Sequence, residues 1–265
     1  MMSPPAFRKA GPSPPTTPGA APERLRQVRI VCFSVQADLV AGAALTPIGI
    51  LALREVRCAR EVPFASLPLL FAIHQFVEAL VWAAADGDVS QGVGHAAAVA
   101  YVIFAVPVLP TLMPLAVLLL EPRKARWRVA PFVGLGLVVS GYLAVAVLTH
   151  PVTVTVHAHA LGYGTGVSNG AFWTVLYIAA VIGPSVLSGY PTIVAFGVFN
   201  LVGLIAVAIV YVEAFASFWC ILAGMASVLV LVHMTRRRKL LDADRMHGVQ
   251  SPRRQAESVP VSSGS

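Results

Sequence analysis

Apolar runs divide the chain into seven segments, each long enough to cross a lipid bilayer. A helix of about 20 residues spans the hydrocarbon core, and such runs occur at residues 31–53, 65–84, 96–120, 129–148, 170–188, 192–212 and 214–234. Between the fourth and fifth runs, Val and Thr alternate and a Gly-rich stretch follows, a period of two that indicates extended structure. The pattern therefore predicts an all-α membrane protein, a seven-transmembrane-helix bundle with a short extended or β-hairpin cap.

Two runs carry local signals beyond their hydrophobicity. The third contains Pro107, Pro110 and Pro114, and proline inside a helix removes a backbone hydrogen bond, which predicts a kink. The fourth has Gly136 and Ser140 at a spacing of four. Small residues at that spacing allow a neighbouring helix to approach closely, so we expect a tight helix contact there.

The charged residues predict an orientation. Basic loops follow the first run (REVRCARE), the third (EPRKARWR) and the seventh (RRRK), whereas DGDVSQGVGH after the second run contains no Lys or Arg. Basic loops stay in the cytoplasm, which places the N-terminus and the cap outside and the C-terminus inside. The basic residues among positions 8–29 go against this orientation, and three explanations remain open: an overridden rule, a reversed topology, or a tail that the mature protein lacks.

Composition agrees with a multi-span protein and divides the chain into three parts. Of the 265 residues, 57% are hydrophobic and 12% charged, and the mean hydropathy of +0.77 lies outside the range of soluble domains. We expect a disordered tail at 1–30, the transmembrane domain at 31–235 and a disordered basic cytoplasmic tail at 236–265. The net charge of +7 belongs to loops and tails, so the expected partner is the lipid bilayer and no nucleic acid.

The second run carries the strongest functional signal. His74, Gln75 and Glu78 lie in its middle, and His74, Glu78 and Trp82 share one helix face at a spacing of four. Ionisable groups at membrane depth are costly and mark functional sites. The alternative is a polar network that only fixes helix packing.

The predicted topology brings further ligand-capable groups to the outer half of the bundle. Asp38 and Cys32 lie at the start of the first helix, and the cap carries two histidines that are separated by one residue. We expect the pocket to draw on these residues: catalytic groups Glu78, His74 and Asp38; metal ligands His74, Glu78, Cys32, His157 and His159; and further pocket residues Gln75, Asn200, Trp219 and Cys220.

Three functions fit these groups. Imidazole, thiolate and carboxylate are ligands for zinc or copper, so the first is a metal-binding protein or metal-dependent enzyme with an outward-facing site. The second is a transporter of a small molecule or ion that uses His74 and Glu78 as a protonatable pair. The third is a seven-helix sensor without catalysis. Nucleophile-elbow, zinc-protease, phosphate-loop and dinucleotide motifs are absent from the sequence, which removes most soluble enzyme classes.

Several motifs resemble an uncharacterised family of bacterial multi-span membrane proteins that typically begin Met-Cys-Phe-Ser. They are Cys32-Phe33-Ser34, PLLFAIHQFVEALVW, LLLEPRK, SGY, AFGVFNL and FWC, and they cover about residues 31–234. The resemblance implies the bacterial cytoplasmic (inner) membrane and no particular activity. Because Val31 stands where the family has its first Met, we expect the physiological chain to begin at residue 31. Removal of that residue would leave Cys32 with a free amine beside its thiol, an N,S chelator. The alternatives for Cys32 are a small buried residue or a lipid-modified one.

Overall fold

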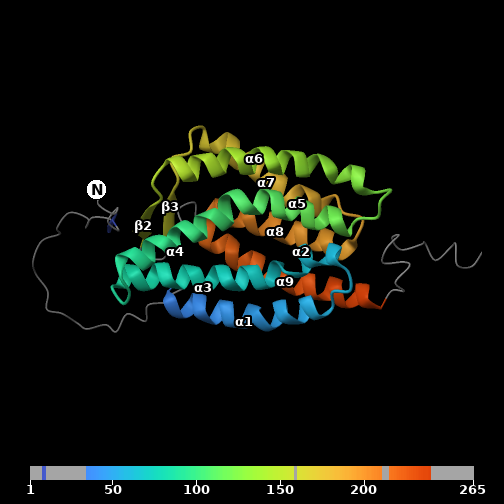
Figure 1. The fold of residues 1–265 in the computed structure, drawn as a ribbon, viewed down its shortest axis with the longest axis horizontal. Helices are drawn as coiled ribbons and strands as arrows, with labels where there is room; N and C mark the ends of the chain where they lie inside the picture. Colours follow the sequence, from blue (N-terminus) through green and yellow to red (C-terminus); the bar gives the residue numbers. More distant parts are fainter. Residues whose placement is uncertain (1–7, 10–33, 158–159, 211–214, 240–265) are drawn as a thin grey trace, which may run out of the picture.

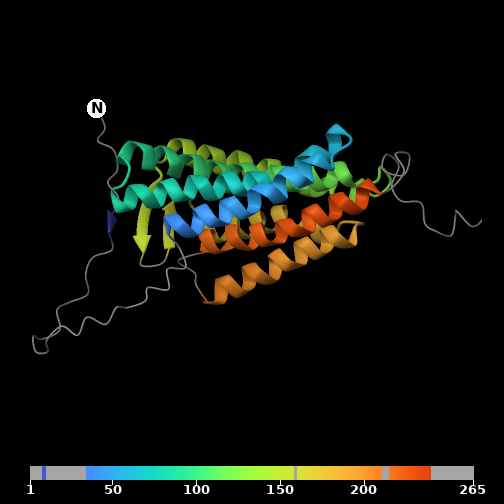
Figure 2. The ribbon, with the colours of Figure 1, turned by 90° about the horizontal axis from the view of Figure 1, so that it is seen from below.

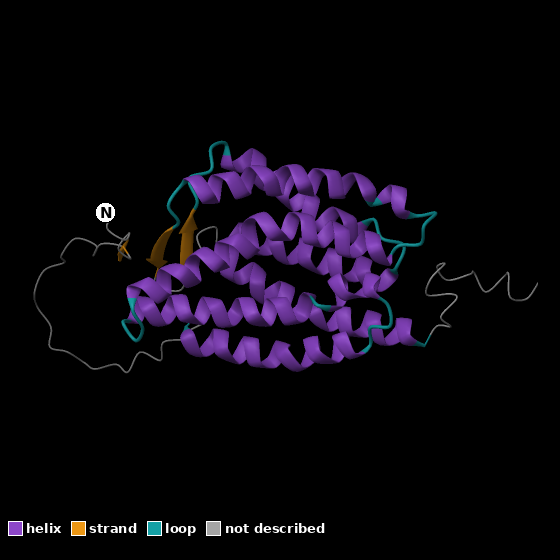
Figure 3. Cartoon of the chain, in the orientation of Figure 1, coloured by secondary structure: helices purple, strands orange, loops and turns teal. Residues whose placement is uncertain are grey.

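The computed structural model describes residues 8–9, 34–157, 160–210 and 215–239. Within these ranges the chain forms a bundle of helices that run along its long axis, with a small sheet at one end (Figures 1 and 3). Each of the seven apolar runs coincides with helix, and the Val/Thr stretch coincides with strands. The predicted helical bundle with a β-hairpin is therefore confirmed at the level of secondary structure.

The elements follow the predicted runs closely. In chain order they are β1 (Arg8–Lys9), α1 (Val35–Arg54), η1 (Ala59–Glu61), α2 (Val62–Ala65), α3 (Leu67–Asp86), α4 (Gln91–Ile103), the π-helical η2 (Phe104–Val108), α5 (Leu109–Leu120), η3 (Arg126–Arg128), α6 (Ala130–Thr149), β2 (Thr153–His157), β3 (Ala160–Gly164), α7 (Gly170–Val186), α8 (Pro191–Val210) and α9 (Phe215–Arg238). The last helix extends beyond residue 234, the predicted end of the seventh run, and includes part of the basic segment.

Local sequence explains where α1 begins and where α3 ends. Ser34 precedes α1 with an extended backbone, and its side-chain oxygen accepts a hydrogen bond from the Ala37 amide at 3.3 Å, which satisfies a free amide of the first turn. At the C-terminal end of α3, Gly87 has a φ of +91°. Glycine adopts this left-handed conformation without steric cost, so the helix stops there and the chain turns into α4.

The third apolar run is one long helical segment that is interrupted in its middle. Pro107 lies inside the π-helical turn η2, between α4 and α5. In this turn the Ala105 carbonyl oxygen accepts a hydrogen bond of 2.5 Å from the Tyr177 hydroxyl of α7. Of the three prolines, Pro107 thus lies in an irregular turn, and a side chain from another helix satisfies one of the carbonyl groups of that turn.

Helix α1 packs against α3 through a narrow face of small residues. Its buried positions are Asp38, Gly42, Leu45, Gly49 and Ala52, at a helical period. A Cβ atom built on Gly42 would lie 2.7 Å from the Phe76 ring, and one on Gly49 would lie 2.6 Å from the Leu69 amide nitrogen. The absence of side chains at these two glycines lets the helices approach, and this approach brings Asp38 against α3.

The expected close contact at Gly136 is confirmed between α5 and α6. A Cβ atom on Gly136 would lie 1.9 Å from the Pro110 carbonyl oxygen. One turn later, the Thr111 hydroxyl of α5 donates a 2.7 Å hydrogen bond to Ser140 of α6. Both members of the small-residue pair therefore contact the neighbouring helix.

The small sheet covers the end of the bundle at which α1 begins and α3 ends (Figure 1). β2 and β3 form an antiparallel hairpin with Thr153 opposite Gly164 and His157 opposite Ala160, and β1 pairs with β2 in parallel. Val152, Val154 and Leu161 pack in one cluster with the α3 and α4 side chains beneath them. The hairpin is thus anchored on the helices and closes this end.

Apolar side chains also cover the outside of the helices. Among the described residues, four helical segments are long and apolar enough to cross a membrane, at residues 35–54, 59–86, 91–120 and 126–149, and two shorter apolar helices occupy 170–186 and 191–206. Val40, Leu137, Val145, Leu148 and Val202 all point outward and are more than half exposed.

Figure 2 shows α9 between α1 and α8, and it contacts both.

Candidate functional site

The polar face of α3 points into the bundle. His74, Gln75 and Glu78 are 3%, 1% and 1% exposed, and Trp82 on the same face is also buried. The opposite side of the helix carries Ile73 and Leu80, which are exposed. The predicted helix face of His74, Glu78 and Trp82 therefore points inward, and Gln75 beside it is buried as well.

Asp38 lies opposite this face, in the first turn of α1. It is 1% exposed, and its carboxyl group interacts electrostatically with that of Glu78. α1 begins and α3 ends at the hairpin end of the bundle, and the two helices pack together (Figure 1). Asp38 lies in the first turn of α1 and Glu78 in the second half of α3, so both belong to the parts of these helices nearer the hairpin. Of the three residues predicted to be catalytic, Asp38 and Glu78 therefore lie on two packed helices, and His74 lies one helical turn before Glu78 on α3.

Aromatic rings enclose His74 and connect it with the hairpin. The His74 ring stacks on Tyr101 of α4 with centroids 3.9 Å apart, and Tyr101 in turn stacks on Tyr163 of β3 at 4.5 Å. Phe104 lies against another side of the imidazole at 4.9 Å. A continuous stack of three rings therefore joins His74 to the hairpin.

Several buried polar atoms in this cluster have no hydrogen-bond partner among the described residues. They are Asp38 Oδ2, His74 Nε2, Trp82 Nε1 and both polar atoms of the Gln75 amide. Buried polar groups without partners are costly, so a cluster of them is a common property of sites that bind a proton, water or a polar ligand. We call Asp38, His74, Gln75 and Glu78 the polar cluster.

The predicted metal set is not supported by the part of the chain that the structure describes. No three His, Cys, Asp or Glu side chains there come together in a way that could hold zinc or copper. Cys32 and His159 lie outside the described residues, and for His157 only the backbone, at the end of β2, is described. The described residues therefore offer two carboxyl groups and one imidazole without a complete ligand set.

The remaining predicted pocket residues occupy α8 and α9. Asn200 is buried on α8, and its Nδ2 donates to the Phe196 carbonyl oxygen at 2.8 Å. Trp219 and Cys220 lie in α9, but their side chains are outside the described part of the structure. Asn200 lines a cavity between α5, α7 and α8.

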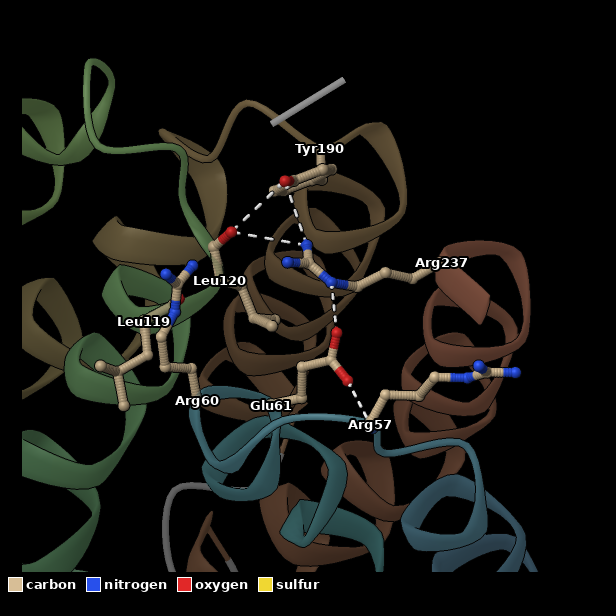
Figure 4. A network of polar contacts seen from close by, with 7 residues as sticks. All are labelled: Arg57, Arg60, Glu61, Leu119, Leu120, Tyr190 and Arg237. Carbon is tan, nitrogen blue, oxygen red and sulfur yellow. Dashed lines mark hydrogen bonds and ion pairs between the residues drawn. The ribbon is translucent and has the colours of Figure 1, made fainter. Parts of the chain in front are cut away.

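A second polar network occupies the opposite end of the bundle and was not predicted. Arg237 of α9 forms an ion pair with Glu61 at 2.8 Å, and its NH1 lies 3.1 Å from the Tyr190 hydroxyl and 3.4 Å from the Leu120 carbonyl oxygen (Figure 4). The Arg57 amide donates to the other Glu61 oxygen at 2.9 Å. The network ties α9 to η1, to the end of α5 and to the turn before α8.

Glu121 makes a second connection at this end. Its Oε1 accepts hydrogen bonds from the Ser188 hydroxyl at 2.5 Å and from the Gly189 amide at 2.8 Å. Nearby, Thr192 and the His233 ring lie 2.6 Å apart. The motif LLLEPRK thus contacts the motif SGY. Nothing in the sequence indicated that these two motifs meet. Glu61 and Arg237 gave no such signal, because each stands in a charged run that reads as a solvated loop.

A family model matches residues 31–245 of the chain, which is most of its length. The family is described as DUF6629, a family of unknown function. No functionally described protein and no solved structure matches the chain significantly. The expected resemblance to an uncharacterised family over about residues 31–234 is therefore confirmed, and the chain belongs to the DUF6629 family.

Proposed function

We propose that this protein is an integral membrane protein that carries a small molecule across the bilayer and exchanges protons at the carboxyl pair of Asp38 and Glu78. The observation that carries the proposal is the burial of both groups, each 1% exposed, on two helices that pack against each other. Two carboxylates held together away from water repel each other, and binding of one proton removes that repulsion. The pair is therefore suited to take up and release a proton when the spacing of α1 and α3 changes.

The surface of the bundle supports its placement in a membrane. Outward-facing positions such as Val138, Leu148 and Val175 are 63%, 78% and 65% exposed, and soluble proteins rarely expose apolar area on this scale. The inward-facing positions carry the carboxyl groups and the imidazole. Lipid outside and polar groups inside is the arrangement expected of a transport protein.

The contacts of His74 provide a connection between the carboxyl pair and the rest of the molecule. The ring stack from His74 through Tyr101 to Tyr163 reaches the hairpin that covers this end. A change in the protonation of the polar cluster therefore acts on the position of the hairpin. A movement of this cover is a means of opening the cluster to one side of the membrane.

The test uses purified protein in vesicles that contain a pH-sensitive dye. Uncharged and amphiphilic solutes are added one by one from outside, and the internal pH is followed. We expect one class of solute to drive proton movement in the wild type. Asp38→Asn and Glu78→Gln, which keep the side-chain size but remove the titratable proton, should each abolish this movement while solute still binds.

Glu55→Gln is the matched control, because Glu55 is an acidic residue whose partner Arg238 is exposed. This variant should move protons as the wild type does. Proton movement that survives in both Asp38→Asn and Glu78→Gln would contradict the proposal. A stoichiometric zinc or copper ion that is lost in His74→Ala would also contradict it and would favour a metal-dependent function.

A further inference from the structure

We infer that a cavity between α5, α7 and α8 is a binding site for an uncharged lipophilic molecule with one hydrogen-bonding group, which enters from the bilayer. The cavity has a volume of about 320 Å³, within the range of about 300 to 1,000 Å³ typical of small-molecule sites. It is separate from the polar cluster. The inference goes beyond the proposed function, and direct binding tests it whether or not protons move.

The walls of the cavity determine the chemical class of the ligand. They are formed mainly by aromatic and aliphatic side chains, among them Phe71, Met113, Trp173, Val181 and Phe196, and no Asp, Glu, Lys or Arg is present in the part of the wall that the described residues form. A charged ligand would lose its hydration there without gaining an opposite charge. The ligand is therefore uncharged, and most of its surface is apolar.

Two polar side chains in the wall provide the hydrogen-bonding point. Ser185 of α7 is fully buried, and its hydroxyl group has no partner among the described residues. Asn200 of α8 also lines the cavity and uses its Nδ2 for the Phe196 carbonyl oxygen, which leaves its Oδ1 for a ligand. A buried hydroxyl without a partner costs free energy, and a hydroxyl or carbonyl group on the ligand would satisfy it.

Exposed residues of α7 in the cavity wall indicate where a ligand enters. Thr174 lines the cavity and is exposed, and its neighbours Phe172 and Val175 are exposed apolar residues. An opening that is surrounded by exposed apolar side chains on an apolar helix such as α7 faces lipid. A molecule dissolved in the bilayer therefore reaches the cavity laterally without passing through water.

The cavity is also in contact with the surroundings of His74. Phe71 lines the cavity, and its ring lies against Phe104 with centroids 6.2 Å apart. Phe104 in turn contacts the His74 ring. Occupation of the cavity would therefore act on the polar cluster through two aromatic rings.

The experiment uses octanol that carries a photoreactive diazirine group, added to the protein in lipid nanodiscs. After illumination, labelled residues are located by mass spectrometry. We expect labelling to concentrate on residues that line the cavity and to be reduced by excess unlabelled octanol. Octanoate and octylammonium, which carry a charge, should not compete.

Two variants test the cavity itself. Val181→Phe should abolish labelling of the cavity, because the larger ring occupies the space. Ser185→Ala should weaken octanol binding about tenfold, as expected for one lost hydrogen bond, and it removes a single buried oxygen without adding volume. Ser185→Ala should therefore fold normally, and it still tests the cavity if Val181→Phe prevents folding.

Val175→Phe is the matched control, since it makes the same substitution on the exposed side of the same helix. It should leave labelling of the cavity unchanged. Three results would each overturn the inference: label spread evenly over lipid-facing residues such as Val138 and Leu148, equal labelling in the wild type and Ser185→Ala, or competition by octanoate as effective as that by octanol.

Discussion

At the scale of single residues, two adjacent arginines at the end of α9 have opposite environments. Arg237 is 3% exposed and pairs with the fully buried Glu61, whereas the side chain of Arg238 is 53% exposed and pairs with Glu55. Both belong to the same basic run, and consecutive residues on a helix point in directions about 100° apart. The phase of α9 therefore decides which arginine supports the fold.

Arg237→Met should destabilise the protein by about 3 to 5 kcal/mol, because it leaves the Glu61 carboxylate buried without its partner. The measurement is thermal or denaturant-induced unfolding in detergent, followed by circular dichroism. The double variant Glu61→Leu/Arg237→Met removes both charges and should recover much of the loss.

Arg238→Met is the control for this prediction, since it breaks an ion pair of the same type one residue away. Exposed pairs contribute about 0 to 1 kcal/mol, so the unfolding midpoint should change little. Equal effects of Arg237→Met and Arg238→Met would show that burial of the Glu61 pair does not stabilise the fold.

At the scale of elements, the crossing of α5 and α6 depends on one glycine of α6. Gly136 touches the α5 backbone at Pro110, whereas a Cβ atom on Gly141, in the same helix, would have no neighbour within 4 Å. The two positions therefore separate the effect of helix packing from the intrinsic helix propensity of glycine.

Gly136→Ala should destabilise the bundle by about 1 to 3 kcal/mol, because the added methyl group forces α5 and α6 apart. Gly141→Ala should be neutral or stabilising by up to about 1 kcal/mol, since alanine favours helix over glycine. Thermal unfolding of both variants in the same detergent measures the difference. A Gly136→Ala variant as stable as Gly141→Ala would contradict the close crossing.

At the scale of the whole molecule, the two ends of the bundle differ in charge. The segments after α1 and after α5, which contain Arg57, Arg60, Arg123 and Lys124, lie with the last turn of α9 at the end opposite the hairpin (Figure 1). At the hairpin end, Asp86 ends α3 and Asp88 lies in the turn before α4, while β1 contributes Arg8 and Lys9. The basic segments at the far end favour the orientation predicted from the sequence, with the hairpin outside and that end in the cytoplasm, whereas Arg8 and Lys9 go against it.

Single cysteines test the orientation, in a background in which Cys32, Cys58 and Cys220 are replaced by Ser. In intact cells, a maleimide that does not cross membranes should label Asp88→Cys. It should label Lys124→Cys only after the cells are permeabilised. Both parent residues are exposed, so poor access does not explain a negative result; the opposite labelling pattern would reverse the topology.

Much of the candidate site could be predicted from the sequence of one helix, α3. His74, Gln75 and Glu78 follow a helical period within an apolar run, so their inward direction was predictable from α3 alone. Asp38 was predicted as a partner from topology, and its approach depends on Gly42 and Gly49, whose lack of side chains is a sequence feature. The stack through Tyr101 and Tyr163 was not predictable, because these two residues come from α4 and β3 and nothing local indicates that they meet.

The sequence alone determined the apolar helices, the hairpin and the polar face of α3, because hydrophobic periodicity depends on neighbours within a few residues of the chain. The tertiary structure decided the contacts between distant segments. It placed Glu61, which stands in a basic loop, against Arg237, it joined Glu121 to Ser188, and it left a cavity beside Ser185 and Asn200. Pairing and empty space depend on how helices cross, and the crossing results from the fit of many side chains that no single segment contains.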